Sequence, residues 1–376
     1  MHYKLKIIVI ILGLKLIYIS FGTLYVHSQN INVSRLEDFT SLFCKNDCGW
    51  YKGIVKNGYE STLNFEDSIK IDANNYRQSE WAFFPLYPFL ISILMKILNI
   101  NFYLSAFILS LIFNYFVLKH LYLFLLDKFN NTNKALYSTI FFATFPFNFY
   151  FSIFYTESLF LAIVLISYNS IKQNRLFIFS ICMLLIPLIR PNGILLIIPF
   201  IFYIIEINKI KINELFRLDT YFQNKEIFIP FISLISFSCW SLYQFKHTGS
   251  LFAFSIAQKG WNKSIQMPYK SLFYNNTLEV QFLSFLFIIL ILIAIYQCIK
   301  IHSFSFSFFI LSQLLLPLIA GSIISIHRYS SIIFPLFYPI SNKMYSKKFK
   351  YILIFIFLIL QLIMFYLYLE EHPLSY

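Results

Sequence analysis

Long apolar runs recur along almost the whole chain and limit the folds that it can adopt. Of its 376 residues, 59% are hydrophobic and only 12% are charged, whereas soluble domains carry about 25% charged residues. Runs of this length indicate transmembrane helices, and the short alternating segments of a membrane β-barrel are absent. After a first run over residues 1–26, the apolar windows cover residues 83–99, 102–126, 136–155, 158–171, 176–189, 194–206, 227–245, 281–299, 303–326, 331–342 and 350–369. The sequence therefore predicts an all-α polytopic membrane protein with about 11–13 transmembrane helices, forming a single membrane domain over residues 1–376.

The formal net charge of +13 is spread over short connections between these windows. Basic residues gather in the segment 208–226 and in the segment 343–350, which contains Lys343, Lys347 and Lys348. Lys and Arg in such connections orient membrane helices and contact anionic headgroups, so both segments are predicted to be cytoplasmic. This distribution excludes a nucleic-acid-binding surface.

The first apolar run begins with Lys4 and Lys6 and resembles a signal peptide, but no small-residue cleavage site follows it. We expect an uncleaved first helix with a cytoplasmic N-terminus. Lys15 lies in the middle of this run. A lysine at that depth costs on the order of 2.5–3.5 kcal/mol on insertion scales unless it faces protein, so it either snorkels or points into the helix bundle.

Two polar stretches are long enough to be functional loops. Residues 27–81 form a first external loop of about 55 residues, far beyond an ordinary connection, and residues 246–280 form a second. Within the first loop, apolar and aromatic residues recur at roughly helical spacing, which favours an amphipathic helix at the membrane surface. These residues are Trp50, Tyr51, Ile54, Val55 and Tyr59.

Cys44 and Cys48 flank Asp47 in the first loop. A disulfide between them is compatible with an oxidising compartment, yet the four-residue spacing is sterically demanding, so both states stay open. The remaining cysteines fall in apolar windows and are interpreted as small hydrophobic side chains. No metal-ligand spacing of Cys and His occurs.

Four charged residues stand at the edges of apolar windows. Asp47 either caps a helix or acts as a catalytic carboxylate beside its aromatic neighbours. Glu157 either faces a cavity or begins a helix that Thr156 caps. Arg190 and Arg328 are suited to a phosphate group through the planar guanidinium, or else they snorkel to headgroups.

Separated patches of the sequence together resemble the PIG-V type mannosyltransferases, the GPI mannosyltransferase II family, in a short bacterial form. The patches are Asp47-Cys48-Gly49-Trp50-Tyr51 with Ile54 and Gly58-Tyr59, Ala82 to Pro88, Tyr155 to Phe160, Arg190 to Gly193, Gly249 to Phe254 with Ala257, Gln258 and Trp261, and Arg328-Tyr329 with Phe334 to Leu336. They cover residues 40–340 in the family's order. One position departs from the family: Asn46 stands where Trp is common before the aspartate.

The resemblance implies a GT-C type membrane glycosyltransferase fold. It also implies transfer of mannose, or a related hexose, from a polyprenyl-phosphate donor to a lipid or glycan acceptor on the non-cytoplasmic face, with inversion. The catalytic residues would be Asp47 and Glu157, and no cofactor is certain, although Glu157 could bind a divalent cation. The substrate-binding residues would be Trp50, Tyr51, Arg190, Asn192, Gln258, Trp261, Arg328 and Tyr329.

A bacterial member of the family would lie in the inner (plasma) membrane with its site facing outward, and a eukaryotic one in the endoplasmic reticulum membrane. Two other classes compete with the enzyme. A transporter or lipid flippase would be expected to show paired halves and broken helices at corresponding positions, and no internal symmetry is visible. A non-catalytic scaffold would use the same motifs to anchor its helices.

Overall fold

The computed structural model describes residues 2–33, 35–72, 75–264, 266–267, 270, 278–300, 303–320, 326–337 and 346–375. These residues form helices joined by short connections, and apart from an isolated bridge between Lys70 and Tyr76 they contain no strand. The predicted all-α class is confirmed. Parts of the second loop and of the segment 343–350 lie outside the described residues.

Four helices of the described chain are long and apolar enough to cross a membrane. Their ranges are Tyr3–Ser28, Phe102–Phe129, Lys225–Thr248 and Lys348–Leu369. Shorter apolar helices of 10–17 residues follow most of the other predicted windows. A straight crossing needs about 20 residues, so the described helices indicate a membrane protein, while the predicted number of 11–13 crossings stays a prediction.

The predicted window 136–155 is interrupted. The α-helix over this stretch ends at Thr144, a 3-10 helix follows over Pro146–Phe151, and the next α-helix begins at Glu157. Pro146 has no N–H to donate and disfavours a helical conformation at Phe145, whose ψ is 136°. Hydropathy alone did not resolve this break, because every residue around it is apolar or small.

The chain packs as two compact units, each assembled from separate stretches of sequence. Unit 1 contains residues 1–55, 87–165 and 330–376, and unit 2 contains residues 56–86 and 166–329. The prediction of a single membrane domain is not tested by this division.

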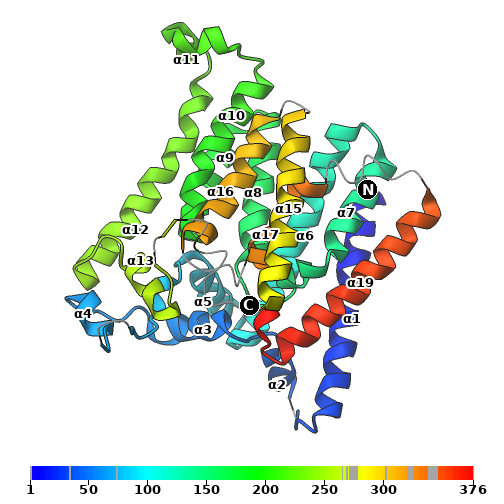
Figure 1. Ribbon diagram of the computed structural model, residues 1–376, viewed down its shortest axis with the longest axis vertical. Coiled ribbons are helices and arrows are strands. Elements are labelled where there is room, and N and C mark those ends of the chain that lie inside the picture. Colours follow the sequence, from blue (N-terminus) through cyan, green and yellow to red (C-terminus); the bar gives the residue numbers. More distant parts are fainter. Residues whose placement is uncertain are drawn as a thin grey trace. The chain divides into compact units, whose positions relative to one another are not determined.

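Unit 1 is built around the three long helices α1 (His2–Ser28), α6 (Phe102–Phe129) and α19 (Lys347–Leu369), which run between the same two ends of the unit (Figure 1). Its other elements are α2 (Leu36–Ser41), most of α3 (Asp47–Asn57), α5 (Leu86–Leu98), α7 (Thr132–Thr144), η2 (Pro146–Phe151), the first part of α8 (Glu157–Lys172), η8 (Phe334–Leu336) and η9 (Pro373–Ser375). α1 and α6 are antiparallel: Tyr3 stacks on Tyr122 at 4.8 Å between ring centroids, and Lys15 contacts Ser110.

The two ends of unit 1 differ in charge. At one end lie the N-termini of α1, α7 and α19 and the C-terminus of α6, with Lys350 placed 4.5 Å over the Tyr137 ring. We call it the basic end, since Lys4, Lys6, Lys128, Lys134 and Lys348 lie there. At the other end, which we call the loop end, Tyr25 of α1 contacts the Leu369 carbonyl of α19, and Lys45 forms an ion pair with Glu371.

Unit 2 contains the remaining helices. They are α4 (Phe65–Ile69), η1 (Glu80–Ala82), the second part of α8, α9 (Leu176–Leu185), η3 (Ile186–Leu188), η4 (Pro191–Leu196), α10 (Ile197–Ile207), η5 (Ile212–Phe216), α11 (Leu218–Gln223), η6 (Lys225–Phe231), α12 (Ile232–Thr248), α13 (Ala253–Ala257), η7 (Gln258–Trp261), α15 (Leu278–Lys300), α16 (Phe304–Ile319) and most of α17 (Ile326–Ser331). α16 packs against both α10 and α15, and α12 packs against α9.

The two polar loops of the sequence meet within unit 2. A buried cluster joins Phe65, Ile69, Trp81 and Phe84 from the first loop and its exit to Trp240, Ala253 and Ala257. The Thr62 N–H donates to the His247 carbonyl at 2.9 Å, and Lys259 forms an ion pair with Glu66. The segment 208–226 lies at the opposite end of α12 from these contacts. The loops of unit 2 are therefore separated from its basic segment by a helix long enough to cross a membrane.

Gly260 allows the closest approach between these loops. A Cβ atom at this position would lie 2.6 Å from the Arg77 carbonyl oxygen and 2.7 Å from the Gln78 Cα. Both atoms belong to the backbone and cannot move aside cheaply. Only glycine fits at residue 260 with the loops in contact.

We expect Gly260→Ala to destabilise unit 2 by about 1–3 kcal/mol, the usual cost of forcing an extra carbon into packed surroundings. Denaturant unfolding of the purified protein, followed by tryptophan fluorescence, measures the change because Trp81 and Trp240 lie in the adjacent cluster. Gly53→Ala is the matched control, since a Cβ at that helical position meets nothing within 4 Å. Equal midpoints for the two variants would contradict the packing described for the loops.

Candidate functional site

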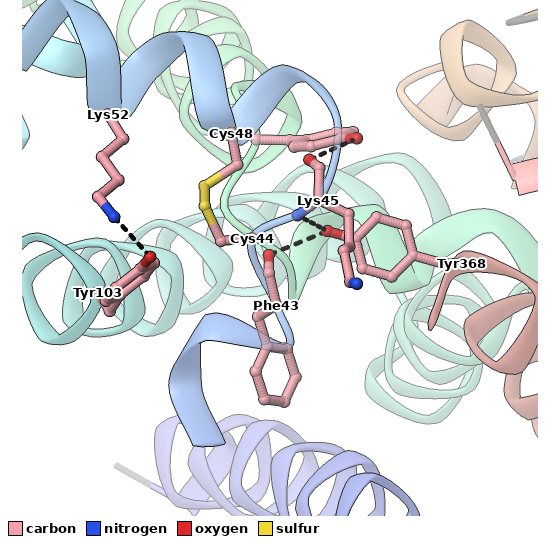
Figure 2. Close-up of a disulfide and its surroundings, with 8 residues drawn as sticks. Phe43, Cys44, Lys45, Cys48, Lys52, Tyr103 and Tyr368 are labelled. Atoms are coloured by element: carbon pink, nitrogen blue, oxygen red, sulfur yellow. Dashed lines mark hydrogen bonds between the residues drawn. A yellow bond between two sulfur atoms is a disulfide. The ribbon is translucent and has the colours of Figure 1, made fainter. Parts of the chain in front are cut away.

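A disulfide between Cys44 and Cys48 closes a five-residue turn at the loop end of unit 1 (Figure 2). The two Cα atoms lie 5.0 Å apart, within the range that disulfides occupy. The turn encloses Lys45, Asn46 and Asp47, with Asn46 in the left-handed region at φ 50°. The alternative left open by the sequence is thus decided in favour of the bond, because a left-handed residue brings the two cysteines together.

Tyr368 of α19 binds this turn through two hydrogen bonds. Its hydroxyl donates to the Phe43 carbonyl at 3.1 Å and accepts from the Lys45 N–H at 2.8 Å (Figure 2). The Tyr155 hydroxyl donates to the Lys45 carbonyl at 3.3 Å, and the Phe154 N–H donates to the Phe43 carbonyl at 3.2 Å. The segment that precedes α8 is therefore paired with the segment that leads to Asp47.

Asp47 is the first residue of α3 and is partly exposed. The helical spacing predicted from Trp50 onward is confirmed as far as Asn57, and Tyr59 lies beyond the helix. Tyr51, one turn after Asp47, is buried with its ring 5.0 Å from that of Tyr87 in α5, while Trp50 is half-buried. A helix N-terminus is a favourable place for a carboxylate, so capping and catalysis both remain compatible with Asp47.

Glu157 is completely buried, with 0% of its surface exposed, and it is the first residue of α8. The Thr156 carbonyl accepts the Phe160 N–H at 2.9 Å, so the helix start predicted from Thr156 and Glu157 is confirmed. Glu157, Tyr51 and Tyr368 all lie close enough to the buried Tyr87 hydroxyl to act on it electrostatically. Among the described residues this hydroxyl has no hydrogen-bond partner. Glu157 thus lies near three tyrosines at the loop end of unit 1.

In unit 2, Arg190 lies at a break between η3 and η4. Arg190 has extended backbone, and a Cβ on Gly193 would lie 2.6 Å from the Ile186 carbonyl oxygen, which explains the glycine. Arg190 is 7% exposed, and its guanidinium lies 5.9 Å from the centroid of the Tyr329 ring. The structure therefore brings together two of the predicted substrate-binding residues that are far apart in sequence.

The other candidates of unit 2 occupy different surroundings. The Asn192 side-chain amide donates to Gln313 of α16 at 2.7 Å in the interior. Trp261 packs edge-on against Phe83 at 5.7 Å, and Gln258 begins the same 3-10 helix, so both belong to the joined loops. Arg328 is half-buried in α17, next to Tyr329.

Several residues of these clusters were not singled out from the sequence. Tyr368 and Gln313 lie inside apolar windows and give no local signal, because their contacts come from residues remote in sequence. Tyr87 belongs to the patch Ala82 to Pro88, so a tyrosine in a proline-rich helix entrance was an available signal. Within the described ranges, no three His, Cys, Asp or Glu side chains gather as a metal site would require.

A scan against protein-family models finds no match for the sequence. A search of curated proteins likewise finds no match.

The disulfide should contribute measurably to stability. Replacing both cysteines, Cys44→Ser with Cys48→Ser, removes a five-residue covalent ring and is expected to cost about 2 kcal/mol of unfolding free energy by loop-closure entropy. Thermal unfolding in detergent, with and without reductant, measures this cost. Cys239→Ser is the control, because Cys239 is a free, exposed cysteine. A wild-type protein whose unfolding is insensitive to reductant would contradict this contribution.

Proposed function

We propose that the protein is a membrane glycosyltransferase that moves a hexose, mannose in the first instance, from a polyprenyl-phosphate donor to a lipid or glycan acceptor on the non-cytoplasmic face. As part of this proposal, the chain is related to the PIG-V type mannosyltransferases and has the GT-C fold that this relation implies. The transfer would be a single displacement. The acceptor hydroxyl gives its proton to a carboxylate and attacks the anomeric carbon, and the bond to phosphate breaks with its electron pair leaving on the phosphate.

The observation that carries the proposal is the placement of Asp47 and Glu157 at the starts of two helices at the loop end of unit 1. Asp47 is partly exposed and Glu157 is fully buried, so the exposed carboxylate is the better candidate for contact with an acceptor. We assign the general base to Asp47. Glu157 is assigned the role of orienting groups around it, beside Tyr87, and it could take part in binding a divalent cation.

Unit 2 supports a phosphate-binding role. Arg190 lies at a helix break with its guanidinium 5.9 Å from the centroid of the Tyr329 ring, and Arg328 is adjacent in sequence to that tyrosine. Arginine presents paired donors that match phosphate oxygens and stabilise charge on a departing phosphate. We assign the leaving phosphate to Arg190 and Arg328, and side-chain contacts with the substrate to Trp50, Tyr51, Gln258, Trp261 and Tyr329. Asn192 positions its helix through Gln313.

Two independent features support an outward-facing loop end. Lys and Arg residues favour the cytoplasmic side, and in unit 1 they collect at the end opposite the disulfide. Disulfides persist in oxidising compartments outside the cytoplasm. Both features assign the Asp47 end to the same, non-cytoplasmic face, which for a bacterial protein is the outer face of the inner membrane.

Cysteine labelling tests the predicted sidedness of unit 2, whose second loop is expected on the non-cytoplasmic face. In a background without the three free cysteines, Lys263→Cys should react with an impermeant maleimide in intact cells, because residue 263 lies in that loop. Lys209→Cys, in the basic segment at the opposite end of α12, should react only after permeabilisation. The reverse pattern would overturn the assigned orientation.

The transferase assignment is tested with purified protein, a radiolabelled polyprenyl-phosphate hexose and membrane lipid extracts as acceptors. Asp47→Asn should lower transfer by about 10²-fold or more, the usual scale for a lost general base. Asp67→Asn, an exposed aspartate in the same loop, should leave transfer unchanged and serves as the control.

The competing class gives a different result in the same assay. A transporter or flippase would move the labelled lipid across proteoliposome membranes without forming a glycosylated product. Retention of more than about a tenth of wild-type transfer by Asp47→Asn would remove Asp47 from the general-base role, since that loss is far below the usual range.

A further inference from the structure

Lys15 is a buried charged side chain in the middle of the apolar helix α1. It is 3% exposed, and its ammonium donates to the Ser110 hydroxyl at 2.9 Å and to the Ser152 carbonyl at 2.7 Å. The alternative left open by the sequence is settled: Lys15 faces the interior of unit 1. Ionisable residues within membrane spans are expensive and are commonly retained for a specific task, and the function proposed above does not use Lys15.

The same ammonium also lies over two aromatic rings. Its nitrogen is 4.7 Å from the centroid of Phe107 and 5.5 Å from that of Phe43, both within the range of a cation–π contact. Lys15 thus contacts α6 and two irregular segments. One segment, at Phe43, leads into the disulfide turn, and the other, at Ser152, follows the 3-10 helix η2.

These two irregular segments carry the two carboxylates. Phe43 precedes Asp47 by four residues, and Ser152 precedes Glu157 by five. The segments are also bonded directly to each other, because the Phe154 N–H donates to the Phe43 carbonyl at 3.2 Å. A chain spans at most about 3.6 Å per residue, so Asp47 and Glu157 both lie within a short length of chain from this junction.

We propose that Lys15 is a positioning residue that fixes the segments bearing Asp47 and Glu157 relative to each other. The Lys15 side-chain nitrogen donates to the Ser152 carbonyl at the end of η2, and the same nitrogen lies over the Phe43 ring. Removing the Lys15 amine would take away one hydrogen bond from the Ser152 segment and one ring contact from the Phe43 segment. The catalytic consequence rests on the proposed glycosyltransferase function, whereas the junction itself does not.

A packing role alone predicts a different outcome. Replacing a buried charge with an apolar side chain of similar length is often neutral or stabilising, because the desolvation cost disappears. Lys15→Met would then leave local dynamics and transfer unchanged. The Lys15→Met variant therefore distinguishes a packing role of Lys15 from a positioning role.

The experiment compares Lys15→Met with wild type by hydrogen exchange and by transfer kinetics. We expect amides in residues 43–48 and 152–157 to exchange at least about tenfold faster, while the rest of unit 1 is unchanged, since the lost charge-assisted hydrogen bond is local. The transfer kcat should fall about tenfold or more with the KM of donor and acceptor within twofold, because geometry rather than binding is altered. Lys119→Met, a partly buried lysine of α6 that lies over Phe116, is the control and should change neither.

Unchanged exchange in the two segments, or uniformly faster exchange throughout unit 1, would overturn the proposal. If Lys15→Met does not insert, Lys15→Gln takes the same test, because it keeps a donor but loses the charge. If neither variant folds, Lys15 is required for the folding of the whole of unit 1, and the proposal of a local positioning role is overturned. If wild-type protein transfers no sugar, the proposed function fails while the exchange measurement still decides the junction. If Lys15→Met transfers sugar normally while Asp47→Asn does not, Lys15 has no positioning role in catalysis and the proposed glycosyltransferase function stands.

Discussion

The irregular backbone between α7 and α8 is the constraint on which unit 1 depends. Within an apolar helical bundle no water replaces lost backbone hydrogen bonds, so each freed carbonyl and N–H needs a protein partner. The break that starts at Pro146 frees several of them. Gln361 of α19 donates to the Ala143 and Phe145 carbonyls at 3.1 and 3.0 Å, Asn148 donates to the Phe142 carbonyl, and Lys15 donates to the Ser152 carbonyl. Buried polar residues of α1 and α19, together with Asn148 of η2 itself, thus satisfy the backbone of this one break, and the break places Glu157 at the start of α8.

The helices themselves were accessible from sequence, and the contacts that position the site were not. Runs of Ile, Leu and Phe predict helices wherever they are long, because burial in lipid or protein rewards an apolar segment that satisfies its own backbone. The Lys15 contact with Ser152 joins residues 137 apart, and no local pattern encodes such a pair. The same holds for Tyr368, which reaches the disulfide turn from the last helix of the bundle.

The candidate site was predicted in its residues and only partly in its arrangement. Local chemistry gave the helix start at Glu157 as one of two alternatives and marked the interruption between apolar windows at Arg190, since both follow from residue types within a few positions. The disulfide stayed undecided because spacing alone does not reveal that Asn46 is left-handed. The placement of Arg190 over Tyr329 depends on tertiary packing, as does the grouping of Tyr51, Tyr87 and Glu157.

In both units, candidate charged residues lie beside helix breaks that contain proline. In unit 1, Pro146 ends a helix and Glu157 begins the next; in unit 2, Pro187 and Pro191 interrupt the chain on either side of Arg190. A charge placed inside a continuous apolar helix would face other apolar side chains, whereas a break offers unpaired backbone groups and room to turn. Buried polar side chains lie at each break. In unit 1, Lys15 and Gln361 donate to backbone carbonyls of the break, and in unit 2 the Asn192 side chain donates to that of Gln313. A buried polar residue that is far from the proline in sequence can therefore belong to the same site as the charged residue next to that proline. Hydropathy does not detect such residues, because they lie inside apolar windows.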